Sequence, residues 1–378
     1  MMYRILETAF LWVVCMALYG QEVKIVVHNT GQQLRHEVVG ACVDDVRHHL
    51  GVADDVPLIV SGAFGQQVDY QMTQDGLLLL DVSVLPEGEA EFTVKPGTPR
   101  EPKHYVYGAQ YRQRLDDLAW ENDRCAYRLY GPALMRKGER SYGIDVWTKN
   151  TPELVVAERY RRHFSKGKKV DISFHIDHGD GMDGYAVGPT LGCGAPVLIV
   201  NDVMQMPWCY ESYKILDNGP LRFTVELTYP KTASGITEHR LIQLDKGSHF
   251  NRMTVWYDGL GQPASLAAGV ALHGGEPLLT NEYILYADPT EKPAQYQSQI
   301  FVGLLFPEGA VTPTKMTNAD GKAHAVGVVN GYEGQPITYY FGAAWSMYDV
   351  PSIDIWKLYA AQHLQQLKEP LGVKVIKK

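Results

Sequence analysis

The sequence predicts an all-β protein built of stacked antiparallel sheets, and three observations support this fold class. Short runs in which apolar and polar residues alternate recur along most of the 378 residues. Turns rich in glycine, proline, asparagine and aspartate separate these runs. Strands do not alternate with helices, as a parallel sheet would require.

The first part of the mature chain, residues 21–98, is predicted to form a small β-sandwich-like module. Val23–His28 alternates as a strand, and further strands are expected at 67–71, 76–84 and 91–95. The sequence Pro96-Gly97-Thr98-Pro99 is typical of a linker and ends the module.

Residues 104–378 are predicted to form the larger domain, which would carry any catalytic function. Its expected strands are 127–130, 155–160, 169–176, 221–229, 238–244, 250–257, 267–273 and 300–305. The clearest helix is 352–368, where Ile355, Leu358, Tyr359 and Leu367 recur at helical intervals before Pro370. Ser352 is expected to cap this helix.

The first 20 residues predict a signal for export. Arg4 precedes a short apolar run at 9–18, which is too short to span a membrane well, and cleavage is expected near Gly20. Lipidation of Cys15 is disfavoured because the preceding residues are not small. The mature protein is therefore expected in the periplasm or outside the cell, without a membrane span.

Composition restricts the partners that the protein can have. The formal net charge of −8 and the absence of a basic stripe argue against binding to nucleic acid. The chain holds 23 tyrosines and 7 tryptophans, whose flat rings with polar edges suit contacts with sugars, although they are also ordinary strand residues. The cysteines lack a C-x-x-C spacing, and both a disulfide between Cys193 and Cys209 and free thiols remain open.

The richest concentration of titratable side chains lies in FHIDHGDGMDGYAVGPTLGCG, residues 174–194. A strand is expected at 171–178, with His175 and Asp177 on the face opposite the apolar residues. A glycine-rich loop then carries Asp183 and leads to Tyr185, and the close glycines 192 and 194 indicate backbone next to another strand or a ligand. The alternative is that the aspartates cap turns and the histidines are satisfied locally.

A second polar group is Trp120-Glu121-Asn122-Asp123-Arg124. The planar fork of Arg124 fits a carboxylate and the Trp120 ring suits a sugar, but a salt bridge within the loop explains Arg124 equally well. Arg222 lies on an alternating strand, where it either faces a ligand or pairs with Glu226.

Metal sites receive little support. The spacing of Asp177, Asp180 and Asp183 does not match a calcium-binding loop, and the required glutamate is missing. His239, His249 and His273 are each expected to be packed or solvent-facing histidines. No metal and no cofactor is predicted.

Four strings in this order, WENDRCAYRLYGPAL, YGIDVWTKN, FHIDHGDGMDGYAVGPTLGCG and NGPLRFTVELTY, resemble an exported Bacteroidetes-type family. This family is catalogued as a domain of unknown function, number 4861. The resemblance covers nearly the whole mature chain and implies a mutarotase-like β-supersandwich. It also implies a role in the breakdown of uronic-acid polysaccharides, in which some relatives act as oligosaccharide dehydratases. It supplies no catalytic residues, so their roles are argued from chemistry.

The chemistry expected is β-elimination from a uronic-acid oligosaccharide by a carbon–oxygen lyase, either a dehydratase or a polysaccharide lyase. His175, oriented by Asp177, would be the base. Arg222 or Arg124 would bind the carboxylate, and Tyr185 would protonate the leaving oxygen. The oligosaccharide would also contact Trp120, Glu121, Asn122, Arg124, Asp177 and Asp183.

Two other function classes remain open on the sequence. A glycoside hydrolase would need two carboxylates about 5–10 Å apart, such as Glu121 with Asp177 or Asp183. A non-catalytic carbohydrate-binding protein would keep the aromatic residues and would not need the titratable groups.

Overall fold

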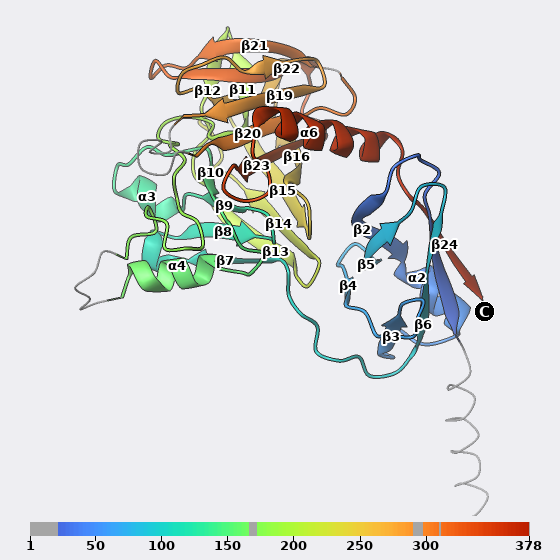
Figure 1. Ribbon diagram of the computed structural model, residues 1–378. Coiled ribbons are helices and arrows are strands. Elements are labelled where there is room, and N and C mark those ends of the chain that lie inside the picture. Colours follow the sequence, from blue (N-terminus) through green and yellow to red (C-terminus); the bar gives the residue numbers. More distant parts are fainter. Residues whose placement is uncertain (1–21, 166–171, 290–297, 310, 378) are drawn as a thin grey trace, which may run out of the picture. The chain divides into compact units, whose positions relative to one another are not determined.

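The computed structural model describes residues 22–165, 172–289, 298–309 and 311–377. The chain divides into two compact units (Figure 1). One consists of the chain up to His104 together with Glu369–Lys378, and the other of Tyr105–Lys368. The predicted signal at residues 1–20 lies outside the described residues.

In its described residues, the first unit is built from two antiparallel sheets and one short helix. The sheets have the strand orders β24-β1-β6-β3 and β2-β5-β4. Their bounds are β1 Val23–His28, β2 Arg35–Cys42, β3 Leu58–Ser61, β4 Tyr70–Met72, β5 Leu77–Val84, β6 Glu89–Pro96 and β24 Gly372–Lys377, with helix α2 at Val43–Leu50. Alternate residues of β1 are fully buried, which is the pattern that the sequence predicts for a strand with one face on a core.

The last strand corrects the prediction that residues 104–378 form one domain throughout. β24 pairs with β1 from Val23 opposite Lys377 to His28 opposite Gly372. Val373 and Val375 pack against the core of the first unit. A single alternating strand has the same pattern whichever sheet it joins, so the sequence alone could not assign its partner.

The second unit contains three antiparallel sheets, with the strand orders β10-β9-β8-β7, β12-β11-β17-β22-β21 and β13-β14-β15-β16-β23-β20-β19-β18. The first has β7 Tyr107–Tyr111, β8 Asp117–Glu121, β9 Ala126–Leu129 and β10 Ile144–Trp147. The second has β11 Cys193–Val200, β12 Val203–Gln205, β17 Ala264–Ala271, β21 Thr312–Thr317 and β22 Ala323–Tyr332. The third has β13 Ser212–Asn218, β14 Arg222–Thr228, β15 Thr237–Asp245, β16 Phe250–Asp258, β18 Leu278–Leu279, β19 Tyr283–Asp288, β20 Ile300–Leu305 and β23 Ile337–Trp345. The predicted all-β class with stacked antiparallel sheets is confirmed.

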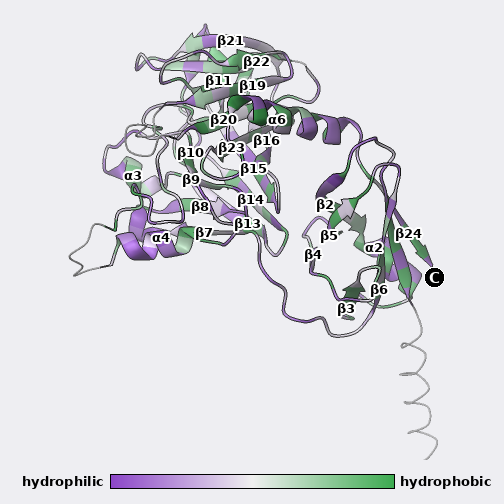
Figure 2. Cartoon of the chain, in the orientation of Figure 1, coloured by the Kyte–Doolittle hydropathy of each residue, from purple (hydrophilic) through white to green (hydrophobic). Residues whose placement is uncertain are grey.

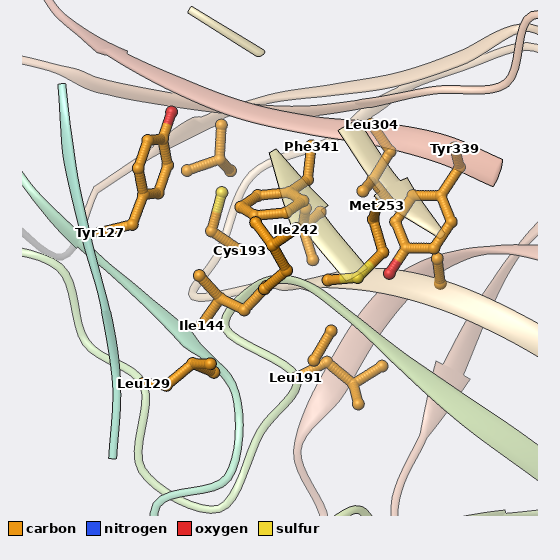
Figure 3. Packing of buried hydrophobic residues seen from close by; sticks show 14 of the residues in the cluster. Tyr127, Leu129, Ile144, Leu191, Cys193, Ile242, Met253, Leu304, Tyr339 and Phe341 are labelled. Atoms are coloured by element: carbon orange, nitrogen blue, oxygen red, sulfur yellow. The ribbon is translucent and has the colours of Figure 1, made fainter. Parts of the chain in front are cut away.

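One large apolar core joins the three sheets of the second unit. Figure 3 shows Ile144 of the four-stranded sheet, Cys193 of the five-stranded sheet and Phe341 of the eight-stranded sheet meeting in it. The glycines 192 and 194 have left-handed backbone with φ of 58° and 97°. A Cβ at either position would lie within 2.5 Å of Ile144 or Phe341, so packing against neighbouring strands explains both.

The predicted C-terminal helix is confirmed as α6, Ile353–Lys368. The Ser352 hydroxyl accepts a hydrogen bond from the backbone N–H of Ile355 at 3.4 Å, as expected of a cap. Trp356 is fully buried, stacks on Phe250 with 4.7 Å between ring centroids, and donates to the Val302 carbonyl at 3.2 Å. This contact attaches α6 to the eight-stranded sheet.

Residues 155–160, predicted as a strand, belong instead to helix α4, Val156–His163. Val156 and Tyr160 are four residues apart and both are buried against β7, β8 and β10. The rest of the helix is strongly polar, and Figure 2 shows α4 mostly in the hydrophilic colour. The apolar spacing therefore fits a helix with one buried face better than a strand.

The described part of the second unit also contains two smaller helical segments, the short helix α3 at Pro132–Arg136 and the 3₁₀ turn η1 at Arg112–Arg114. Cys193 and Cys209, whose pairing the sequence left open, are both free thiols. No helix in the described part of the chain is long and apolar enough to cross a membrane.

The packing of α6 generates a prediction about stability. Trp356→Ala should lower the free energy of unfolding by about 3–5 kcal/mol, because it removes a fully buried ring and leaves a cavity. Urea denaturation followed by circular dichroism measures the change. Leu358→Ala, whose side chain on the same helix is 56% exposed, is the control and should change the value by less than about 0.5 kcal/mol. Equal effects of the two substitutions would contradict this packing.

Candidate functional site

The candidate site lies on the face of the β10-β9-β8-β7 sheet that is turned away from the main core. Alternation along the strands puts Leu118, Leu129 and Ile144 into that core. The same alternation puts Asp117 on β8, Arg128 on β9 and Asp145 on β10 on the opposite face, and all three are buried. Charged side chains are rare at such positions unless they are paired.

Helix α4 and the loop 172–185 cover this face (Figure 1). The loop corrects the predicted strand at 171–178, because its described part, from Ile172, consists of turns. Phe174 still enters an apolar cluster, as expected, but this cluster lies beneath the loop and includes Trp147 at 4.8 Å and His163 at 4.0 Å between ring centroids. A hydrogen bond of 2.8 Å from Asp183 N–H to the Phe174 carbonyl closes the loop.

The guanidinium of Arg128 is the centre of the buried charges. It contacts the carboxylate of Asp145, that of Asp183 at 2.9 Å and that of Asp117 at 3.7 Å. The four side chains are at most 3% exposed. The Arg128 Cζ atom also lies 5.0 Å from the centroid of the Trp147 ring, within cation–π range. Three carboxylates therefore share one buried cation.

Burial away from water keeps protons on these carboxylates to higher pH than usual. Burial raises the pKa of Asp117 to about 6, although Arg128 opposes the shift. Burial likewise raises the pKa of Asp145 to about 7, and it raises the pKa of Asp183. A buried carboxylic acid with a pKa near neutrality is a common feature of acid–base sites.

His175 lies at the edge of this cluster and faces solvent. Its Nδ1 atom is 3.3 Å from Oδ2 of Asp183 and 3.2 Å from the Asp183 carbonyl oxygen. The side chain is 58% exposed, so the Nε2 side of the ring is open to a ligand. Burial of the inner side lowers the pKa of His175, which favours the neutral imidazole that a general base requires. The carboxylate behind the ring is that of Asp183, whereas the sequence suggested Asp177.

Arg114, which the sequence analysis did not select, lies beside the same cluster. Its positive charge acts on Asp117, Asp183 and His175. Within the described residues it forms no hydrogen bond or ion pair, and its buried Nη1 atom has no acceptor. A half-buried guanidinium that has no ion pair and whose charge acts on an open imidazole is a candidate for binding a carboxylate.

Tyr185 lies near the site but is enclosed. It is 5% exposed, its hydroxyl has no partner among the described residues, and burial raises its pKa well above the usual value. Its ring packs edge-on against His273, which in turn binds Asp288 at 2.7 Å. The charge of Asp145 acts on both Tyr185 and His175, so the two residues flank one region of the protein.

The two arginines proposed from the sequence as carboxylate binders are engaged by protein carboxylates. Arg222 is held by both oxygens of Asp245, at 2.6 and 2.8 Å, and not by Glu226. Arg124 pairs with Asp349 at 2.8 Å and lies 3.5 Å from the carboxylate of Asp123. These pairs favour the alternative that the sequence left open, in which the cations stabilise the fold.

The remaining residues of the 120–124 group are buried in the protein. Trp120 is fully buried and donates to Asn251 at 2.8 Å, so neither face of its ring is open to a sugar. The Asn122 side chain donates to the carbonyls of Asp245 and Ser248, both at 2.7 Å. Their positions support structural roles and do not bring them to His175.

Glu121 has a specific structural partner, the N-terminus of α4. Its carboxylate accepts the backbone N–H groups of Val155 and Val156 at 2.8 and 2.7 Å and pairs with Lys149 at 2.7 Å. Anions are favoured at helix N-termini, where the first N–H groups lack partners within the helix. The side chain is thus a distant cap for the helix that covers the site.

Asp177 and Asp180 shape the loop. The Asp177 carboxylate accepts the N–H groups of residues 179 and 181 at 2.8 and 2.9 Å, as the turn-capping alternative predicted. Asp180 pairs with Arg162 at 2.6 Å. In the part of the chain that the structure describes, no three acidic, histidine or cysteine side chains form a group suited to a metal ion.

The sequence did contain a signal for the residues that were missed. Asp117, Arg128 and Asp145 interrupt three strands whose other residues, apart from Glu121 of β8, are apolar or aromatic. Charged residues at the buried positions of neighbouring strands indicate an ion cluster. Sequence alone could not pair them, because β8, β9 and β10 meet only in the folded sheet.

The raised pKa of Asp145 generates a prediction about pH. An aspartate in the unfolded chain titrates near pH 4, so the folded protein binds this proton more tightly, and the free energy of unfolding should fall as pH rises from about 4 to about 7. Asp145→Asn should remove this contribution. The decrease in the free energy of unfolding between about pH 4 and pH 7 should then be smaller by an amount on the order of 2–4 kcal/mol.

Urea titrations at a series of pH values measure these slopes. Asp202→Asn, which changes an exposed turn residue of the same unit, is the matched control and should retain the wild-type slope. A slope in Asp145→Asn equal to that of the wild type would show that this carboxyl does not titrate in the interval.

Comparison with solved structures places the fold among carbohydrate-active enzymes of known structure. An α-mannosidase and a second protein of glycosyl hydrolase family 38, both from Enterococcus faecalis, each match with a TM-score of 0.52 at 10% sequence identity. The matches cover 94% of this chain but only 46% and 47% of those chains. This chain therefore spans a little under half the length of these enzymes, and the likeness is one of fold.

Sequence comparison identifies closer relatives. An uncharacterized protein, P7, from Formosa agariphila is 27% identical over 325 residues, which cover 80% of this chain and 79% of the relative. The family model for a domain of unknown function (DUF4861) matches residues 26–373, which include the whole candidate site. The resemblance inferred from the four sequence strings is thus confirmed, and the chain belongs to the DUF4861 family.

Proposed function

We propose that this protein acts on uronic-acid oligosaccharides and cleaves a carbon–oxygen bond by β-elimination. The single observation that carries the proposal is that an open imidazole, His175, lies at the edge of a buried acid cluster and within the electrostatic influence of Arg114, a guanidinium without an ion pair among the described residues. The likeness in fold to glycoside hydrolases supports a carbohydrate as the substrate class.

His175 would act as the general base. In β-elimination the base removes the proton on the carbon next to the carboxylate, so that an enolate forms. The lowered pKa of His175, caused chiefly by burial, leaves the imidazole neutral at physiological pH, and Asp183 holds the ring from behind.

Arg114 would bind the substrate carboxylate and stabilise the enolate. A guanidinium contacts both oxygens of a carboxylate in one plane, and these oxygens gain negative charge as the proton leaves. The Arg128 guanidinium cannot take this role because protein carboxylates already occupy it.

Collapse of the enolate forms the new carbon–carbon double bond and breaks the bond to the oxygen on the next carbon. This oxygen must take up a proton. The imidazolium of His175 can return the proton that it removed, provided that both groups lie on one face of the sugar ring. Tyr185, the donor suggested by the sequence, has an enclosed hydroxyl, so it would serve only if substrate binding opened the region around it.

The two alternatives have weaker support. Glu121 would be one carboxylate of a hydrolase pair, but it caps α4 and is 2% exposed. A binding protein without catalysis would not require a histidine backed by a carboxylate and placed next to a free guanidinium. Mass spectrometry of the oligosaccharide after incubation separates the three classes. Elimination of water lowers its mass by one water, hydrolysis adds one water, and binding alone leaves the mass unchanged.

The proposal includes export from the cytoplasm. Its support is the sequence pattern of residues 1–20, a positive charge followed by a short apolar run. Polysaccharide fragments are met in the periplasm or outside the cell, which fits the proposed substrate class. Fractionation of cells that express the full chain tests this location.

His175→Ala should lower the rate of formation of unsaturated product at least 100-fold, because general bases contribute factors of about 10²–10⁴. Ultraviolet absorbance of the new double bond measures this rate with uronate oligosaccharides. The matched control is His36→Ala, which removes a histidine that is 55% exposed and 2.9 Å from Asp81 in the first unit. Near-normal turnover by His175→Ala with intact circular dichroism would exclude this residue as the base.

Arg114→Gln should raise KM about tenfold or more and lower kcat as well, because the lost guanidinium would bind the carboxylate in the ground state and more strongly as the enolate forms. Arg222→Gln should leave KM and kcat within about threefold of the wild-type values, because the Arg222 guanidinium is already bound by the Asp245 carboxylate. Steady-state kinetics on the same oligosaccharides gives both numbers. The reverse ranking would assign the carboxylate to Arg222, as the sequence first suggested.

A further inference from the structure

A groove lies between β7 and β13, the edge strands of the four-stranded and eight-stranded sheets. Its volume is about 470 Å³. Its lining consists of Tyr107, Gly108, Ala109, Gln110, Arg112, Gln113, Tyr213, Ile215 and Asn218. The mixture of aromatic rings, amides and one cation differs from the apolar lining typical of sites for small hydrophobic ligands.

The floor of the groove is fixed by hydrogen bonds. The Asn218 side chain accepts the N–H of residue 108 and donates to its carbonyl, both at 2.9 Å, which joins the edge of β7 to β13. Gln110 donates to the Tyr210 hydroxyl at 3.1 Å, and the Tyr210 ring contacts Tyr213 edge-on at 5.8 Å between centroids. The groove is therefore formed before any ligand arrives, which lowers the entropic cost of binding.

The wall and rim of the groove offer groups that are available to a ligand. Tyr107 and Tyr213 are 38% and 36% exposed, although large aromatic rings are usually buried. The Gln113 side chain makes no hydrogen bond to the described residues. Arg112 makes a single contact, from Nε to Gln110 at 3.5 Å, which leaves both terminal nitrogens unpaired within the described chain.

The groove is connected to the candidate site through η1. Arg112 and Gln113 line the groove, and Arg114, the next residue, acts on His175 and Asp183. A 3₁₀ turn advances only about 2 Å per residue, so the same short turn carries residues of the groove and Arg114 of the site.

We propose that this groove binds the part of an anionic oligosaccharide that extends away from the reacting uronate. Tyr107 and Tyr213 would contact the sugar rings through their flat faces. Arg112 and Gln113 would bind an anionic substituent, either a carboxylate or a sulfate ester. The inference rests on the proposed function for its substrate class, and it makes the protein selective for longer chains.

Isothermal titration calorimetry tests the groove directly, because binding needs no turnover. The probes are a galacturonate dimer, a galacturonate hexamer, a sulfated κ-carrageenan hexasaccharide and neutral cellohexaose. Wild-type protein should bind one of the two anionic hexasaccharides, the carboxylated or the sulfated one, at least tenfold more tightly than the dimer or cellohexaose. The preferred anion identifies carboxylate or sulfate. Equal affinity for all four probes would overturn the proposal.

Two substitutions locate the binding. Tyr213→Ala should weaken binding of the preferred hexasaccharide about tenfold and that of the dimer less than twofold, whereas Tyr213→Phe, which keeps the ring, should stay within about threefold of the wild type. Arg112→Gln should remove the preference for the anionic over the neutral hexasaccharide. The controls are Phe64→Ala, an aromatic ring that is 96% exposed in the first unit, and Arg252→Gln, an exposed cation on β16. Neither should change the affinities.

The outcomes keep this inference separate from the proposed reaction. An unchanged affinity of Tyr213→Ala for the hexasaccharide, with an intact circular dichroism spectrum, would contradict binding in the groove. This result would hold whether or not the protein catalyses β-elimination. Normal turnover by His175→Ala overturns the reaction and leaves the calorimetric result standing.

Discussion

The arrangement of the candidate site depends on one buried cation, the Arg128 guanidinium. A charge removed from water is tolerated only when partners surround it, and here the partners come from β8, β10 and the loop 172–185. Because Asp183 is one of those partners, the same ion pairs that satisfy Arg128 also fix the loop on the sheet. His175, which contacts Asp183, takes its position at the edge of the cluster as a consequence.

The aromatic side chains around this cation have a related role. Trp147, Tyr160 and Phe174 form a layer between the sheet and its cover, and the guanidinium lies 5.0 Å from the centroid of the Trp147 ring. This layer excludes water and therefore strengthens each electrostatic contact within it. It also explains why three carboxylates near one cation have raised pKa values, since the surplus negative charge has little solvent to stabilise it.

The cover of the site is held from a distance as well. Glu121, at the end of β8, caps the first turn of α4, so the strand that contributes Asp117 also anchors the helix above it. The likeness to solved structures is one of fold alone, and function depends on the residues of a site and not on the architecture that carries them. The proposed chemistry therefore rests on Arg114, His175 and Asp183 and not on the likeness in fold.

The sequence by itself determined the all-β class, strands such as β1, β5, β14 and β16, and helix α6, because these features depend on the local spacing of apolar residues. It also directed attention to the loop that holds His175 and Asp183. The local spacing gave wrong predictions for two segments that pack against residues far away in the sequence. Residues 155–160, most of which lie in α4, and residues 172–178 were both predicted as strands. Only the tertiary structure showed that Asp117, Asp145 and Asp183 pair with Arg128. It also showed that Asp245 binds Arg222, whereas Arg114 has no ion pair among the described residues. The physical reason is that the periodicity of a segment reports which of its faces is buried, whereas the partner of a buried charge is set by contacts between segments far apart in the chain.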